Sequence, residues 1–149
     1  MLVPRTHLEP SLKDLYDYLD AIGSNVTSSV ASGSAVALTT ATTANVTSIT
    51  LTPGTWDISG VVGLLPAATT SITVRQGGAN TTSATLGALG TKYVVTSAAV
   101  VPTAVGQEQP IPSHRVTVTV NTTLYLVAQA TFTVSTMGAY GIISARRVA

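Results

Sequence analysis

Cysteine and charge are what this 149-residue sequence has least of. It contains no cysteine, which excludes a disulfide framework and thiolate chemistry. Charged residues make up only 9 % of the chain, far below the usual quarter of a soluble domain. The formal net charge is +1, so no strong attraction to nucleic acid or anionic lipid is expected. A surface that is polar through threonine and serine hydroxyls suits a β-rich subunit that packs against neighbours.

Long apolar runs and aromatic residues are also scarce. No run approaches the length of a membrane span, and the N-terminus lacks the basic-then-apolar pattern of a signal peptide. Aromatic residues make up 5 % of the chain, which leaves no stacking platform for single-stranded nucleic acid. We therefore expect no membrane insertion and no nucleic-acid partner.

Catalytic constellations are missing as well. A nucleophilic triad would need His114, Asp57 and a nearby serine, but no Gly-x-Ser-x-Gly elbow exists. Paired carboxylates would have to be Asp57 and Glu108, and nothing in the sequence places them together. The other histidine, His7, lies in an N-terminal stretch that looks loosely ordered. These patterns predict a non-enzymatic protein without catalytic residues.

Metal and cofactor sites are not indicated either. Metal ligation needs clustered histidine, cysteine or carboxylate side chains. The one acidic cluster, Asp14, Asp17 and Asp20, is spread along a predicted helix and indicates a solvated face. Gly77-Gly78 is not a phosphate loop, because no helix with Gly-Lys-Ser/Thr follows. We expect no metal and no cofactor.

Alternation of apolar and polar residues is strongest between His114 and Val134. This period of two is typical of strands with one buried face. A break at 121–123 predicts two long antiparallel strands joined by a short turn.

Similar patterns predict an all-β domain over residues 35–149. The expected strands are 35–40, 44–52, 55–64, 70–76, 91–98, 114–120, 123–134 and 139–147. Turns are expected at 52–55 and 77–80, and a proline-containing loop over 99–113. Eight short strands indicate a two-sheet sandwich, and eight is the jelly-roll number. The expected interior comprises Val46, Ile49, Leu51, Trp56, Ile58, Val61, Ile72, Val74, Val94, Val116, Val118, Val120, Leu124, Leu126, Phe132, Ile142 and Val148.

Residues 1–34 form a separate N-terminal arm in this interpretation. A capping pattern at Ser11 precedes apolar residues at 3-4-3 spacing, Leu12, Leu15, Leu19 and Ile22, which predicts a short helix over 11–22. Such a helix is too short to be stable alone. It either folds onto the edge of the β-domain, associates with copies of itself, or docks on another protein. Residues 23–34, small and polar, predict a flexible or extended linker.

Two strands carry apolar residues on the face expected to be solvated. Tyr125 and Val127 lie there on one strand, and Tyr140 and Ile142 have a similar position on the last one. Strands that are apolar on both faces are buried on both faces. These four residues are therefore predicted to form the contact between subunits of a rotationally closed oligomer. The alternative is that they decorate the surface.

The final segment, TTLYLVAQATFTVSTMGAYGIISARRVA over 122–149, resembles the C-terminal end of small bacteriophage proteins. The segment SITLTPGTWDISGVVG over 48–63 resembles the early strand pair of the same group. That group is similar to the trimeric jelly rolls of the tumour-necrosis-factor/C1q type. The resemblance implies a virion structural protein that forms homotrimers, located on the particle surface and made in the host cytoplasm.

The place on the virion stays open at this point. A capsid decoration or head-fibre protein would attach through residues 1–34 to other virion proteins. A tail-fibre tip would contact the host surface, including its glycans. The initial methionine and the lack of a long fibrous shaft favour the first. A lectin-like interaction module is a further alternative.

Overall fold

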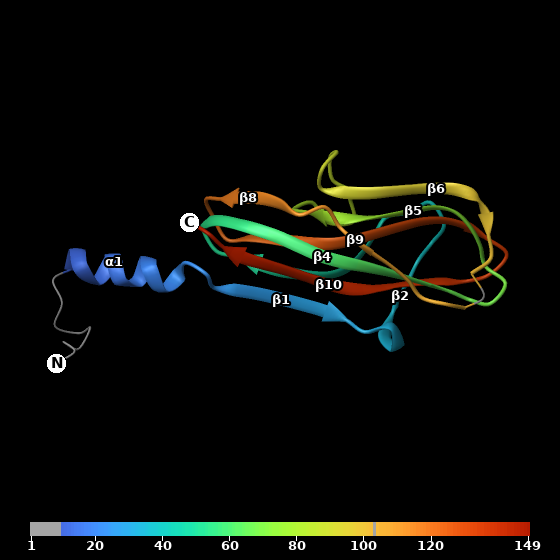
Figure 1. The fold of residues 1–149 in the computed structure, drawn as a ribbon, viewed down its shortest axis with the longest axis horizontal. Coiled ribbons are helices and arrows are strands. Elements are labelled where there is room, and N and C mark those ends of the chain that lie inside the picture. Colours follow the sequence, from blue (N-terminus) through green and yellow to red (C-terminus); the bar gives the residue numbers. More distant parts are fainter. Residues whose placement is uncertain (1–9, 103) are drawn as a thin grey trace.

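The computed structural model describes residues 10–102 and 104–149. They form a β-sandwich of two antiparallel sheets, with one helix that projects from an end of the sandwich (Figure 1). This confirms the all-β expectation.

The larger sheet is built around two long central strands. Strand β4 (Gly54–Pro66) and strand β10 (Met137–Arg147) pair from Met137↔Pro66 to Arg147↔Trp56 without a register shift. The remaining strands lie on either side of this pair. Beside β10 are β1 (Asn25–Val30) and β2 (Val36–Ala37), and beside β4 are β7 (Gln107–Pro110) and β8 (His114–Val118).

The smaller sheet has the order β3-β9-β5-β6. Its strands are β3 (Ala44–Leu51), β9 (Thr122–Thr133), β5 (Ser71–Asn80) and β6 (Lys92–Val100). The predicted hairpin over 114–134 is wrong: β8 pairs with β4 in the larger sheet, whereas β9 pairs with β3 and β5 in the smaller one. The break at 121–123 is therefore where the chain crosses between sheets.

Apolar side chains of both sheets meet between the layers. Trp56 is 2 % exposed, and its indole Nε1 donates to the Thr52 carbonyl oxygen at 2.9 Å. Ten residues of the expected interior are buried: Val46, Ile49, Leu51, Trp56, Ile58, Ile72, Val118, Leu124, Leu126 and Phe132. Val94, Val120 and Ile142 are instead exposed, because they point outward or lie beyond a strand end.

The predicted linker over 23–34 is in large part a strand. The helix α1 (Pro10–Ala21) is followed by Gly23, whose positive φ of 84° turns the chain and whose N–H donates to the Arg147 carbonyl at 2.8 Å. Strand β1 then pairs with β10 from Asn25↔Arg146 to Val30↔Gly141. A short 3-10 helix, η2 (Ser32–Ser34), follows.

Two further expectations need correction. Gly77 to Asn80 belong to strand β5 and do not form a turn. Glycine suits position 77 because the Tyr93 ring occupies the space that a Cβ there would fill. The loop predicted over 99–113 contains strand β7, which ends at Pro110. A proline is compatible with β7 because the strand pairs on one side only, with β4.

Candidate functional site

Helix α1 carries an apolar stripe, continued by Ile22 directly after it, that is exposed in the described chain. Leu12, Leu15, Tyr16, Leu19 and Ile22 are 45 %, 50 %, 45 %, 52 % and 39 % exposed. Figure 1 shows the helix leading away from the sandwich, so it does not fold onto the edge of the β-domain. The stripe predicted from the sequence is therefore present, and the described residues of the chain do not cover it.

The opposite face of the helix is charged and satisfied within the helix. Lys13 Nζ donates to Asp17 Oδ2 at 2.6 Å, one turn further along. This hydrogen bond and the charge of Asp17 raise the pKa of Lys13. The pairing leaves the leucine side as the face that needs a partner.

The four residues predicted to form the trimer contact do not lie together. Tyr125 and Val127 point to the outer face of the smaller sheet, because Leu124 and Leu126 between them point into the core. Tyr140 and Ile142 point to the outer face of the larger sheet, on the other side of the sandwich.

Val127 requires a correction of its own. It is 0 % exposed within a single chain and so presents no surface to another subunit. The loop between β5 and β6 is hydrogen-bonded to the residue that pairs with Val127. Asn45, the register partner of Val127, donates to Ser83 Oγ at 2.7 Å and accepts from the backbone N–H of Ala84 at 2.7 Å. Sequence reasoning could not find this loop contact, since it joins segments almost forty residues apart.

The Tyr140 ring packs on the backbone of Gly63, which buries part of the ring. Its ring fills the place of a Cβ at Gly63, its register partner, and its hydroxyl donates to Glu108 Oε1 at 3.1 Å. Burial, together with the Glu108 hydrogen bond and charge, raises the pKa of Tyr140. Ile142 next to it is 39 % exposed, and this pair remains available for contact with another chain.

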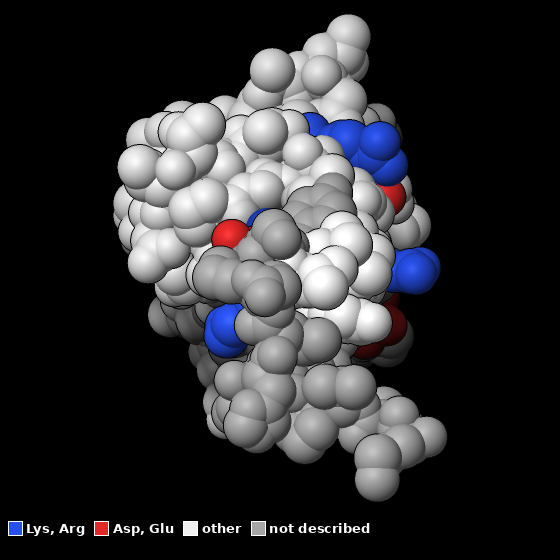
Figure 2. Space-filling view, turned by 90° about the vertical axis from the view of Figure 1, so that its left-hand side faces the viewer, with Lys and Arg blue, Asp and Glu red and all other residues white. Residues whose placement is uncertain are grey.

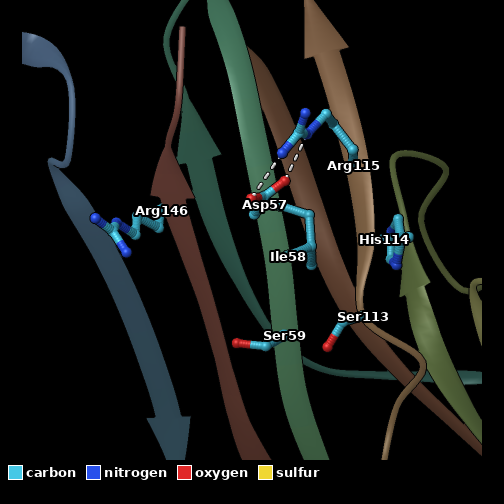
Figure 3. A pocket seen from close by; sticks show the side chains of 7 residues that line it. All are labelled: Asp57, Ile58, Ser59, Ser113, His114, Arg115 and Arg146. Atoms are coloured by element: carbon cyan, nitrogen blue, oxygen red, sulfur yellow. Dashed lines mark hydrogen bonds and ion pairs between the residues drawn. The ribbon is translucent and has the colours of Figure 1, made fainter.

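A polar hollow lies on the same outer face, toward the helix end of β4 (Figure 3). Arg115 donates to both carboxylate oxygens of Asp57, through Nε at 2.7 Å and through Nη2 at 3.0 Å. These bonds lower the pKa of Asp57, and the charge of Arg146 acts in the same direction. Ser59 and Ser113 line the hollow as well.

The geometry of this hollow does not form a catalytic relay. His114 Nδ1 lies 3.0 Å from the Pro112 carbonyl oxygen, while Asp57 is held by Arg115, so neither group is bound to the other or to a serine. Glu108 pairs with Gly63, six residues along β4 from Asp57, which is about 20 Å at ~3.3 Å per residue. The two carboxylates are too far apart to act on one bond.

Charges form no continuous patch in the part of the chain that the structure describes when it is viewed from the helix end (Figure 2). Among residues 10–102 and 104–149, no three histidine, aspartate or glutamate side chains gather as metal ligands do. No described helix is long and apolar enough to cross a membrane.

An apolar strip along strand β6 was not expected. Val94, Val100, Val101 and Val105 are 53 %, 43 %, 52 % and 60 % exposed, on or just after the edge strand of the smaller sheet. The sequence signal for it is the complete lack of charged residues between Lys92 and Glu108.

No family model and no curated protein matches the chain. Among solved structures, the chain is similar to the crystal structure of the infectious bursal disease virus VP2 subviral particle, with a TM-score of 0.39 and 14 % sequence identity. The match covers 87 % of this chain and 36 % of that one.

Proposed function

We propose that this protein is a non-enzymatic structural protein of a bacteriophage virion, which forms a homotrimer and projects from the particle. In this proposal it decorates the capsid or forms a head fibre. The N-terminal segment attaches it to other virion proteins, and the sandwich points outward. It needs no cofactor.

The observation that carries the proposal is the helix α1 at the end of the sandwich. Its leucine stripe is about half exposed, although a helix of 12 residues is marginal in water without a partner. The sandwich, by contrast, has a complete core of its own. A domain that folds independently and carries an exposed apolar helix at one end is what we expect of a subunit that attaches to a larger assembly.

Strand pairing supports a jelly roll. If β1 with β2 and β7 with β8 are each counted as one interrupted strand, the first strand pairs with the last, the second with the seventh, the third with the sixth and the fourth with the fifth. This nested order is that of a long hairpin folded over into two sheets. The segments that resemble phage proteins, 48–63 and 122–149, contain the second half of β3, most of β4, and all of β9 and β10.

A tail-fibre tip is the second candidate. It is favoured by the apolar strip from Val94 to Val105, which runs along β6 and continues toward the end of the sandwich that lies away from α1 (Figure 1). An exposed, uncharged strip at the outer end of a projecting module would suit contact with a host surface.

The test is a truncation that removes residues 1–22 and keeps β1. We expect the truncated protein to stay folded and to stop co-sedimenting with phage particles that lack their own copy. The matched control is Lys13→Ala with Asp17→Ala, which changes the charged face of α1 and leaves the stripe. Binding of the truncated protein at the level of the full chain would refute attachment through this segment.

A further inference from the structure

The stripe on helix α1 has the spacing of a coiled-coil seam. Leu12, Leu15, Leu19 and Ile22 follow each other at three, four and three residues, so Leu12 and Leu19 occupy a positions and Leu15 and Ile22 occupy d positions of a heptad. Ile22 directly follows Ala21, the last residue of α1. All four side chains are exposed in a single chain. A seam of this kind is complementary to a copy of itself.

Charge placement agrees with a copy of the same chain as the occupant. In this register Lys13, Asp14 and Asp17 take positions b, c and f, on the side away from the seam. The Lys13–Asp17 ion pair is already closed within one helix. Tyr16, which is 45 % exposed, occupies an e position beside the seam. It adds apolar surface there, and it places no charge where like charges of parallel helices could repel each other. A basic partner protein that bound the leucine seam would not contact Asp14 and Asp17, because they lie on the opposite face of the helix.

Residue choice within the seam favours more than two helices. Dimers prefer β-branched residues at a with leucine at d, whereas leucine at a with isoleucine at d shifts the preference to trimers and tetramers. Here both a positions are leucine, and one of the two d positions is isoleucine. Tyr16 widens the apolar face in the same sense.

The connection to the sandwich makes a parallel bundle possible. The turn at Gly23 is tied to the last strand by its hydrogen bond to Arg147, and the Arg147 N–H donates to the Ser24 carbonyl at 2.9 Å. The C-terminal end of the helix is therefore fixed beside the sandwich. Three helices around a threefold axis that runs along the bundle are parallel, which would place all sandwiches at one end of the bundle.

From these observations we infer that the helices α1 of three copies pack in parallel through Leu12, Leu15, Leu19 and Ile22, and that this bundle is what joins the subunits. The inference rests on the trimer in the proposed function and deepens it. It moves the main subunit contact from the sheet faces to the helix, and leaves attachment to the particle as a property of the assembled bundle.

The first test is Leu15→Glu with Leu19→Glu in the full-length chain, compared with Lys13→Ala with Asp17→Ala as the control. Mass by light scattering is expected at three times 15.1 kDa for the wild type and the control, and at 15.1 kDa for the seam variant. Fluorescence of the single tryptophan, Trp56, reports whether the sandwich stays folded, since this residue is buried in the core. A seam variant that keeps the wild-type mass, or a wild-type protein that is monomeric, overturns the inference.

The second test addresses orientation and uses the lack of native cysteine. Leu19→Cys is expected to form disulfide-linked dimers under mild oxidation, because parallel helices in register bring the same a position of two copies together. Asp17→Cys, on the outer side, is expected to stay unlinked. Equal cross-linking of both variants, or none at position 19, contradicts a parallel seam.

Particle binding separates this inference from the proposed function. A seam variant that stays trimeric but no longer binds phage particles would refute the bundle and support direct docking of the stripe on a virion protein. A seam variant that becomes monomeric supports the bundle whether or not a particle partner is found.

Discussion

Helix α1 and strand β1 are neighbours in the sequence and opposites in the structure. Strand β1 shares six register pairs with β10 and is an integral edge of the larger sheet. Helix α1, only a few residues earlier, exposes its apolar stripe and leads away from the sandwich (Figure 1). The two elements meet at Gly23, where the chain is tied to Arg147, so part of the predicted arm over 1–34 pairs with the larger sheet.

Hydroxyl side chains explain why β1 resembles a linker in the sequence. The Thr27 hydroxyl lies 3.0 Å from that of Ser144, and the Ser28 hydroxyl lies 2.6 Å from that of Thr47. The first contact is a cross-strand pair between β1 and β10, and the second joins β1 to β3 of the other sheet. In a chain so poor in charge, serine and threonine build edges of the sheet as well as loops.

The largest expected effect comes from cutting the arm at two places. Removal of residues 1–22 should leave the melting temperature of the sandwich within about 3 °C, because α1 leads away from the sandwich and its apolar side chains are exposed. Removal of residues 1–34 should lower it by about 10 °C or more and promote aggregation, since it strips β1 from β10 and opens a sheet edge. Thermal unfolding followed by circular dichroism checks both. Equal melting temperatures would mean that β1 adds nothing to the domain.

A second contrast compares the two outer faces of the sandwich. Val127→Asp should destabilise the protein by about 3 kcal/mol or more, since it puts an unpaired carboxylate where the side chain is 0 % exposed. Ile142→Asp, on the open face at 39 % exposure, should cost about 1 kcal/mol or less. Urea unfolding monitored through Trp56 measures both. A Val127→Asp protein as stable as the wild type would show that this side chain is not buried.

The smallest expected effect is the pH dependence of stability that comes from Tyr93 on β6. Burial raises the pKa of Tyr93 to about 12, and its hydroxyl makes no hydrogen bond within the described residues. Because the folded pKa lies above the unfolded value of about 10, the neutral ring contributes full stability below pH 10 and loses it between pH 10 and 12, roughly 2 kcal/mol in all.

Tyr93→Phe should abolish this part of the loss and be neutral or slightly stabilising at pH 7, since it removes a buried hydroxyl without a partner. Urea midpoints of wild type and variant at pH 8 and pH 11 give the comparison. A parallel loss of stability in both proteins would assign the effect to other groups.

Most strands could be predicted from period-two patterns, but their partners could not. The alternation from Arg115 to Val134 marks two strands correctly, yet the same pattern is satisfied whether they pair with each other or join different sheets. Local patterns carry no signal about register partners more than eighty residues away, such as Ala44 and Ala128. This is why the predicted hairpin failed while its strand positions held.

In the candidate site, too, features that depend on local sequence could be predicted and features that depend on tertiary contacts could not. The stripe of Leu12, Leu15 and Leu19 depends only on helical spacing, so the sequence predicts it well. The loop held by Asn45, the register partner of the buried Val127, is a tertiary contact without a sequence signature. The prediction that Tyr125 and Tyr140 lie on one face is wrong, because β9 and β10 belong to different sheets. A strand that is apolar on both sides gives no signal about which sheet it joins.

The positions of the chain ends have a practical consequence for protein engineering. The C-terminus lies at the same end of the sandwich as the helix, and the Thr55 N–H donates to the Ala149 carbonyl oxygen at 2.7 Å (Figure 1). A cargo fused there would crowd the bundle proposed above. The turn around Ala67, bonded to Thr136 at the far end, is the better place to insert a peptide for display.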